Sequence, residues 1–376
     1  MDLDFFAAEE NSNNLKANIN TFLNATESNS LSEFRLSEDE FEQLIDYFIN
    51  SEDLENTELC AELAFSQHPY SSRLLVQLCD TLILSGSIKK ALSMLDNYID
   101  SFSSCATLYI VYARAYIKSM EFKKAKEWYK KSMMHIEDDI ERYELTYSLA
   151  LDCIEVKEFN RAIFYLNEID SMNCSAHEYY NDYAFCFDKI NNTTKAIEYY
   201  NKFLDADPFN DIVWFNIGTM HAKISNYDAA IEAYEYSIAL NSKNDSSLFN
   251  LALVYINLSR FKEAIEPLKS CIECDSSSID SYFTLAEAYI GLKELQLAKE
   301  TYTKILGIDN NNKEASVSYM CIKAIQQYLD GEFDEFVYTI SDLTSDNFEA
   351  ISKIYRFYPS LSNDSNFLDL LLKIKN

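Results

Sequence analysis

The residue types that perform catalysis occur in this chain, but their spacing matches no catalytic motif. The five glycines are scattered, so they cannot form the glycine-rich loop that binds a phosphate. His177-Glu178 begins like the His-Glu-x-x-His motif of zinc proteases, but the fifth residue is Asn181. No serine lies in the Gly-x-Ser-x-Gly turn of hydrolases. We therefore expect a protein that is not an enzyme and that uses no cofactor.

One pair of cysteines, Cys271 and Cys274, has the Cys-x-x-Cys spacing of metal and redox sites. A zinc site normally requires a second such pair or a nearby pair of histidines, and the sequence offers neither. Cys271 also falls in the apolar pattern of a helix that ends there, so we expect no metal. The nine cysteines are an odd number and mostly far apart, which is typical of a protein kept in a reducing cytoplasm.

The composition narrows the fold and the partners. Only 5 Gly and 4 Pro occur among 376 residues, which excludes folds with many strands and tight turns. The net charge of −29 disfavours binding to nucleic acid or to an anionic membrane surface. The densest group of cations, within residues 123–131, is interleaved with Glu121 and Glu127 and is interpreted as a solvated helix face. No signal peptide and no transmembrane span are predicted, so we expect a cytoplasmic protein.

A repeat of 34 residues organises most of the chain. The segment that starts at Phe215 is matched by segments that start at Phe249 and Phe283. The same period predicts eight repeats, with three additional residues before the fourth. They occupy residues 38–71, 72–105, 106–139, 143–176, 177–210, 211–244, 245–278 and 279–312.

Each repeat has the pattern of two amphipathic helices joined by a short polar turn. The twentieth residue of the repeat is small in seven of eight cases. These residues are Thr57, Ala91, Ala125, Ala162, Ala196, Ala230, Ala264 and Ala298. Alanine at a fixed position indicates that two helices approach closely there. One helix pair cannot bury its own apolar stripe, so the repeats must stack into an all-α fold.

This pattern resembles the tetratricopeptide repeat (TPR) family, and the resemblance covers about three quarters of the chain. The best match to the family pattern is Trp214, Ile217, Gly218, Tyr227, Ala230 and Tyr234. The resemblance implies a right-handed α-solenoid, or superhelix, of tandem helix-turn-helix repeats. It also implies a scaffold for protein–protein interaction rather than an enzyme.

The two ends depart from the repeat. Residues 1–37 are acidic and rich in Asn and Ser, and we expect this segment to be mobile. Within it, Leu3-Asp4-Phe5-Phe6 is a candidate docking motif or a segment that folds back as a cap. Residues 313–345 are predicted to form a degenerate ninth repeat. Residues 346–376 are predicted to form capping helices, near 346–357 and 364–375.

In proteins of the TPR family, the first helices line a concave groove, and the resemblance places positions 2, 5, 6, 9, 12 and 13 of each repeat in it. The candidate binding residues at these positions are Phe215, Phe249, Phe283, Asn216, Asn250, Thr219, Leu253, Ile256 and Ile290. The three phenylalanines either form an aromatic column that contacts a ligand or pack against the neighbouring repeat. The lysine and asparagine clamp by which some TPR proteins hold a carboxylate is absent.

We therefore predict an adaptor that holds a peptide or helix of another protein in its groove. Near its start, Glu42 and Asp46 make the groove acidic, which favours a partner segment with Lys or Arg beside Leu or aromatic residues. Two alternatives remain open at this point. The chain is a self-associating structural component of an assembly, or it is a regulator that binds a small molecule.

Overall fold

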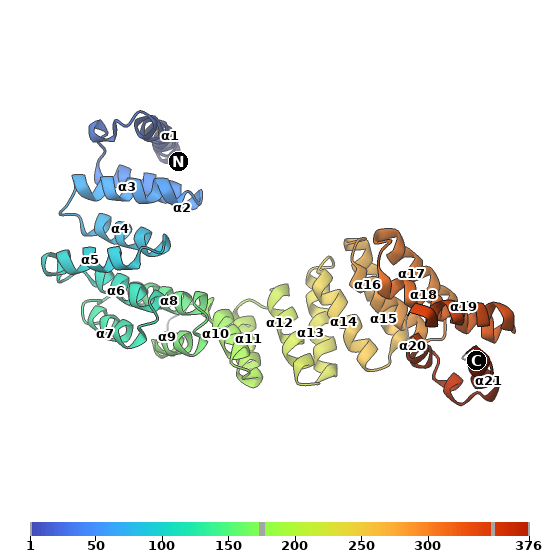
Figure 1. Ribbon diagram of the computed structural model, residues 1–376. Coiled ribbons are helices and arrows are strands. Elements are labelled where there is room, and N and C mark those ends of the chain that lie inside the picture. Colours follow the sequence, from blue (N-terminus) through green and yellow to red (C-terminus); the bar gives the residue numbers. More distant parts are fainter. Residues whose placement is uncertain (1, 173–176, 347–349, 375–376) are drawn as a thin grey trace. The chain divides into compact units, whose positions relative to one another are not determined.

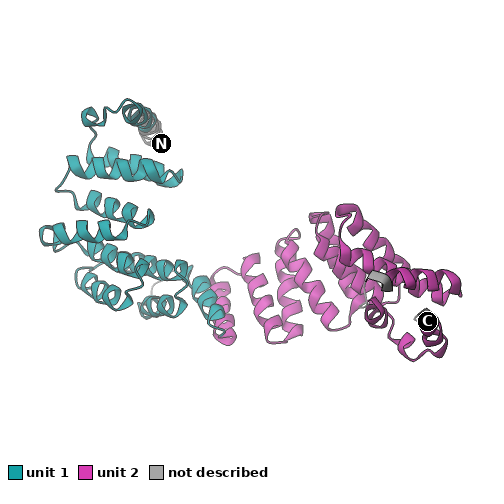
Figure 2. Cartoon of the chain, viewed as in Figure 1, with its two compact units in different colours: residues 1–191 teal, residues 192–376 magenta. Residues whose placement is uncertain are grey.

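The computed structural model describes residues 2–172, 177–346 and 350–374, and these residues form helices and turns without a strand (Figure 1). The predicted all-α solenoid fold is confirmed. The chain divides into two compact units, unit 1 (residues 1–191) and unit 2 (residues 192–376), shown in Figure 2. The division falls inside the predicted repeat 177–210. In the described part of the chain, no helix has the length and apolar character needed to cross a membrane.

Unit 1 is built of helices that pack on their neighbours in the chain. They are α1 (Asp2–Glu27), α2 (Glu38–Asn50), α3 (Leu54–Gln67), α4 (Ser72–Leu84), α5 (Ile88–Tyr98), α6 (Ala106–Lys118), α7 (Phe122–Ser132), α8 (Asp139–Glu155), α9 (Phe159–Ser171) and α10 (Tyr179–Lys189). Short 3-10 helices follow α1 (η1, Leu31–Glu33) and α5 (η2, Ile99–Phe102).

Unit 2 continues the same arrangement. Its helices are α11 (Thr193–Ala206), α12 (Asp211–Lys223), α13 (Tyr227–Leu240), α14 (Asp245–Asn257), α15 (Phe261–Cys274), α16 (Ile279–Gly291), α17 (Leu295–Ile308), α18 (Lys313–Leu329), α19 (Phe333–Asp346), α20 (Ala350–Phe357) and α21 (Ser365–Ile374), with the 3-10 helix η3 (Pro359–Asn363) between the last two. The first helices α12, α14, α16 and α18 each begin at the first residue of a predicted repeat.

The turn inside each repeat ends the first helix in the same way. Its central residue has a positive φ, and these residues are Glu52, Gly86, Met120, Lys157, Asn191, Ser225, Ser259, Lys293 and Gly331. In the turn after α12, the amide of Asn226 donates to the carbonyl of His221 at 2.9 Å, and the amide of Ser225 donates to that of Ala222 at 3.0 Å. This is the Schellman arrangement, which satisfies carbonyls that a helix end leaves without partners. The left-handed residue is glycine at only two of the positions named.

The turn between repeats is fixed by a capping side chain that recurs every 34 residues. In unit 2 the capping residues are Asn210, Asn244, Ser278 and Asn312. Each side chain accepts a hydrogen bond from the backbone amide three residues later, for example from Val213 to Asn210 at 3.1 Å. Such a cap satisfies one of the unpaired amides of the first turn and stabilises a helix by about 1 kcal/mol.

Small residues allow the two helices of a repeat to approach closely. In unit 2, Ala230, Ala264 and Ala298 are fully buried. At Gly218 on α12 the approach within a repeat is so close that a Cβ atom would lie 2.6 Å from Cε1 of Tyr234 on α13. The buried ring of Tyr234 thus lies directly against the small residue of the other helix.

The N-terminal segment contains helices that precede the first repeat. Its residues form α1 and η1, and the ring of Phe22 is fully buried. Phe22 lies 5.5 Å from the ring of Phe34 and 5.4 Å from that of Phe48 on α2. A short apolar stripe within this polar sequence thus covers the first repeat, whereas the mobility expected of residues 1–37 stays a prediction. The side chains of Leu3–Phe6 lie outside those that the structure describes.

Two first helices are longer than the others. α8 and α18 have 17 residues each, whereas α12, α14 and α16 have 13. The three additional residues before the fourth repeat thus extend α8 at its start. In the segment predicted as a degenerate ninth repeat, α18 is longer at its end. Gly331 and the start of α19 therefore lie one helical turn further along the repeat than the corresponding residues of the other repeats.

The close approach at Gly218 gives a first prediction. Gly218→Ala should destabilise the chain by about 1–3 kcal/mol, because the added methyl group displaces the Tyr234 ring in a packed interior. Thermal unfolding measures the change. Gly307→Ala on α17 is the control, because nothing lies within 4 Å of its added Cβ. This control should stabilise by roughly 0.5–1 kcal/mol, and equal effects of the two changes would contradict the packing account.

The left-handed turn residues give a second prediction. Ser225→Gly should raise the free energy of unfolding by about 0.5–1 kcal/mol, because glycine adopts a φ of 59° without a Cβ clash. Urea denaturation measures this gain. Glu232→Gly, at an exposed position inside α13, should instead lower stability by about 1 kcal/mol. A loss of stability in both variants would show that the Ser225 turn is not strained.

Candidate functional site

The three predicted phenylalanines lie on consecutive first helices, Phe215 on α12, Phe249 on α14 and Phe283 on α16. Each ring is partly buried and packs against the core of unit 2. Phe215 is 6.0 Å from the ring of Tyr234, and Phe283 is 5.9 Å from that of Tyr302. The rings therefore contribute to packing and also reach the surface. We call this surface, on the side of α12, α14, α16 and α18 that carries these residues, the first-helix face of unit 2.

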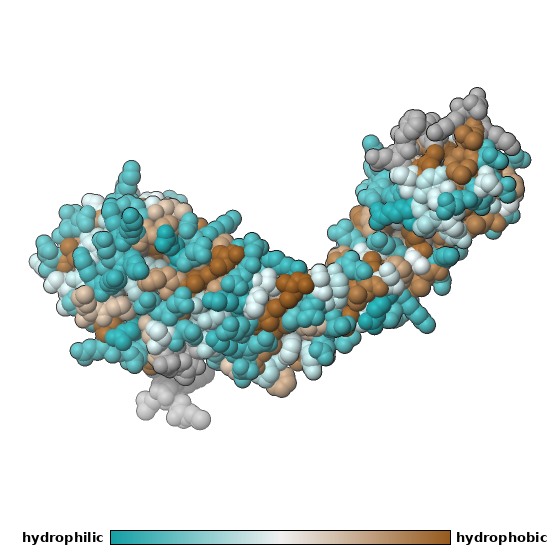
Figure 3. Space-filling view, turned by 90° about the horizontal axis from the view of Figure 1, so that it is seen from below, coloured by the Kyte–Doolittle hydropathy of each residue, from teal (hydrophilic) through white to brown (hydrophobic). Residues whose placement is uncertain are grey.

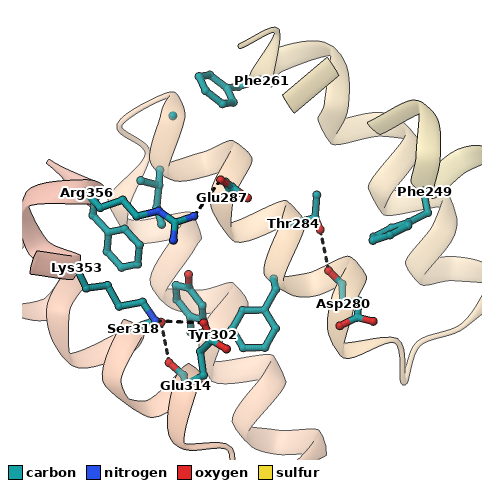
Figure 4. A pocket seen from close by; sticks show the side chains of 14 residues that line it. Phe249, Phe261, Asp280, Thr284, Glu287, Tyr302, Glu314, Ser318, Lys353 and Arg356 are labelled. Carbon is teal, nitrogen blue, oxygen red and sulfur yellow. Dashed lines mark hydrogen bonds and ion pairs between the residues drawn. The ribbon is translucent and has the colours of Figure 1, made fainter. Parts of the chain in front are cut away.

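A pocket of about 540 Å³ opens on the first-helix face (Figure 4). Its lining is contributed by α14, α15, α16, α17, α18 and α20. The lining residues are Phe249, Phe261, Asp280, Phe283, Thr284, Glu287, Ile290, Gly291, Tyr302, Glu314, Ser318, Lys353, Arg356 and Phe357. Aromatic rings thus form much of the wall, and charged groups lie among them.

The structure brings some of the predicted residues together and leaves others apart. Phe249, Phe283 and Ile290 line the pocket. The remaining candidates lie on α12 and α14 outside it and are half-buried. They are Phe215, Asn216, Thr219, Asn250, Leu253 and Ile256. Thr219 already has hydrogen-bond partners, since its hydroxyl donates to the carbonyl of Phe215 at 3.1 Å and accepts from Tyr234 at 3.3 Å.

Ion pairs connect α20 to the first helices at this pocket. Arg356 lies 3.5 Å from Glu287 of α16, and Lys353 lies 3.4 Å from Glu314 of α18 (Figure 4). The side chains of Arg356 and Glu287 are 72% and 51% exposed, so water screens this pair strongly. Three carboxylates and two cations line the pocket, which leaves an excess of one negative charge. The carboxylate of Asp280 makes no ion pair with the described residues.

The floor of the pocket carries a neutral hydroxyl. Burial raises the pKa of Tyr302 to about 12, so this phenol stays protonated at neutral pH. Thr284 is already satisfied, because its hydroxyl donates to the carbonyl of Asp280 at 2.9 Å. The pocket therefore combines an apolar wall with carboxylates at its rim.

Sequence reasoning missed the part of the pocket that α20 supplies. Lys353, Arg356 and Phe357 come from the segment predicted to cap the stack, not from a repeat. The amphipathic pattern of α20 indicates a helix that packs on the protein, but it does not indicate where. The acidic residues Asp280 and Glu287 occupy positions 2 and 9 of their repeat, which the family resemblance had marked as groove positions.

In unit 1 a network of charges includes the ninth residues of two repeats, Asp80 and Arg114. Arg114 on α6 donates to Asp80 on α4 at 2.8 Å and to Asp152 on α8 at 2.9 Å. Burial raises the pKa of Asp80 to about 6, although Arg114 opposes this change. The side chains of these three residues are at most 26% exposed, so the network ties three consecutive first helices together.

The predicted acidic start of the groove is partly neutralised. Arg73 lies 3.2 Å from Glu42 and 3.1 Å from Asp39. Burial raises the pKa of Glu42 and of Asp46 above the ordinary value for each group. Arg73 opposes the rise in the pKa of Glu42 and is the second residue of the next repeat.

The cysteine pair does not form a recognisable site. Cys271 is buried and its sulfur lies 3.2 Å from the hydroxyl of Ser281, whereas Cys274 is exposed. Across the described residues, no group of three or more His, Cys, Asp or Glu side chains is arranged to hold a metal ion.

Two family models match part of the repeat region. Residues 187–244 match the family described as tetratricopeptide repeat, and residues 223–305 match the family described as anaphase-promoting complex, cyclosome, subunit 3. No curated protein matches the chain.

Solved structures with a similar fold share little sequence with this chain. The C-terminal part of a TPR repeat-containing protein from Cytophaga hutchinsonii is 14% identical over 64% of this chain and 97% of that one, with a TM-score of 0.52. MamA is 22% identical over 46% and 94%, with a TM-score of 0.44. YrrB, described as a TPR protein with an unusual peptide-binding site, is 19% identical over 49% and 94%, with a TM-score of 0.43. At these identities the likeness concerns the fold alone.

The Asp80 network gives a prediction about pH. A carboxyl whose pKa is raised on folding binds protons more tightly in the folded chain, so its contribution to stability increases as the pH falls through about 6. As the pH falls from 7.5 to 5, the melting temperature of the wild type should therefore rise relative to that of Asp80→Asn. Asp228→Asn, which removes an exposed carboxylate on α13, serves as the control. If the difference in melting temperature between the wild type and Asp80→Asn is the same at both pH values, the raised pKa of Asp80 is contradicted.

Proposed function

We propose that the chain, which is a tetratricopeptide-repeat protein, is a non-enzymatic adaptor that holds a segment of another protein on the first-helix face of unit 2. The observation that supports this most is the pocket in which Phe249 and Phe283, at the same position of consecutive repeats, lie beside unneutralised Asp280. Apolar rings next to a carboxylate form a surface that a peptide or helix can use.

The chemistry of the pocket favours a particular kind of segment. Phe249, Phe261 and Phe283 offer apolar surface to a Leu or aromatic side chain, whose burial is worth roughly 1.5–3 kcal/mol. Asp280 and the excess negative charge of the lining favour a Lys or Arg beside that side chain. The half-buried amides of Asn216 and Asn250 extend the surface beyond the pocket toward α12 and would suit the main chain of the same segment.

Self-association is a second candidate function. The last helices expose apolar side chains, with Tyr338 of α19 at 78% and Leu368 of α21 at 38% exposure. On the face shown in Figure 3, however, apolar side chains lie in patches between hydrophilic ones, as on many monomeric proteins. Sedimentation separates the two candidates, because an assembly component would show a mass that rises with concentration and falls in Tyr338→Ser.

The adaptor proposal predicts a specific loss of binding. The chain with Phe249→Ala and Phe283→Ala should capture its partner from a lysate with at least about tenfold lower affinity than the wild type, because each lost anchor costs about 1–2 kcal/mol. A pull-down followed by titration with the identified partner measures this. Circular dichroism checks that the variant stays folded.

Phe215→Ala is the matched control for this experiment. It removes a half-buried phenylalanine at the same position of the preceding repeat, but Phe215 does not line the pocket. The control should therefore retain most of the affinity. Capture of the same partner by the double variant at wild-type affinity would place the binding surface elsewhere.

A further inference from the structure

The helix α20 does not continue the stack of unit 2 in the way of its other repeats. In those repeats each new first helix packs chiefly on the second helix before it, as α16 does on α15 and α18 on α17, although in unit 1 α8 packs chiefly on the first helix α6. In contrast, α20 packs chiefly on the first helix α18 and only slightly on α19. Its carbonyl at Ala350 accepts a hydrogen bond from the thiol of Cys321 at 3.6 Å, and Cys321 is the ninth residue of its helix, a groove position. The helix α20 therefore lies on the first-helix face itself.

The contacts of α20 are those expected of a bound segment. Its cations pair with carboxylates at groove positions, Lys353 with Glu314 and Arg356 with Glu287. Its aromatic residue, Phe357, lines the same pocket as Phe283. The ion pair of Arg356 and Glu287 joins residues 69 positions apart in the sequence. An eight-residue helix of this chain thus shows which chemistry the face accepts.

We propose that the partner segment is a short basic helix that resembles α20, with one Lys or Arg four residues before an aromatic residue and another directly before it, and that it binds by displacing α20. This inference rests on the proposed function. It adds the class of the partner segment and the competition with α20. The spacing follows from Lys353, Arg356 and Phe357, which lie on one side of α20 at intervals of three, four and one residues.

The strength of the α20 contacts is consistent with displacement. Both ion pairs include at least one side chain that is more than half exposed, and exposed pairs contribute little to stability. The anchoring is therefore mainly apolar and rests on Ala350, Ile354 and Phe357, which are buried. A partner helix with the same cations and a larger apolar face would compete for the same carboxylates.

The test uses the full chain and a synthetic probe. The probe is a fluorescein-labelled peptide with the sequence of residues 350–358, and its binding is followed by fluorescence anisotropy. The chain with Lys353→Glu and Arg356→Glu should bind this peptide about tenfold more tightly than the wild type, because repulsion from Glu314 and Glu287 releases α20 from its position. The matched control carries Lys262→Glu and Lys269→Glu on α15, and it should bind like the wild type.

Two further arms locate the peptide. Adding Phe283→Ala to the double variant should abolish the gain, and a peptide carrying K353E and R356E should not bind the double variant more tightly. A double variant that binds the original peptide no better than wild type overturns the inference. A gain that survives Phe283→Ala also overturns it, because the peptide then binds away from the pocket. A wild-type chain that dimerises while the double variant stays monomeric overturns it too, because the occupant is then α20 of a second copy.

Failure of this inference can be distinguished from failure of the proposed function. If the double variant binds the peptide no more tightly than the wild type while partner capture still depends on Phe249 and Phe283, the adaptor proposal stands. In that case only the proposed resemblance of the partner segment to α20 is contradicted. If partner capture does not depend on these residues, the adaptor proposal fails whatever the peptide does.

Discussion

The close approach of two helices within each repeat is the contact on which the rest of the structure depends. A fully buried alanine on the second helix, or Gly218 on α12, lets the backbones meet, and a large ring such as Tyr234 fills the adjacent space. Because the contact recurs every 34 residues, each helix pair presents the same apolar surface to the next. The first helices then lie on one side of the stack, and their second, fifth and ninth residues share a face.

That face is where the chain departs from regular packing. The repeats by themselves supply aromatic rings and carboxylates, as at Phe283 and Glu287, but no cation in the pocket. The cations come from α20, which follows the last repeat and does not share the sequence pattern of the repeats. The pocket of unit 2 therefore arises from two parts of the chain with different constraints. The repeats must stack on one another, whereas α20 packs on a surface that the repeats form.

Much of the fold could be predicted from the sequence because its determinants are local and periodic. The alanines, the capping asparagines and the aromatic positions recur at fixed spacing, and the starts of α12, α14 and α16 follow from them. The packing of α1 could not be predicted in this way, since Phe22 stands in a single short stripe without a repeat to support it. The position of α20 depends on Arg356 meeting Glu287 far away in the sequence. For the same reason Phe249 and Phe283 reach the pocket, whereas Phe215, at an equivalent position, does not.

The central claim is that the first-helix face of unit 2 contacts a partner protein at this pocket. Site-specific photo-crosslinking tests it most directly, with p-benzoylphenylalanine placed at Phe249 or, for comparison, at the exposed Tyr236 of α13. The account predicts that illumination of a cell lysate links one protein to the Phe249 position, through a segment that carries Lys or Arg beside an aromatic residue. It predicts no link to that protein from the Tyr236 position. A partner that crosslinks from Tyr236 and not from Phe249 would contradict the claim.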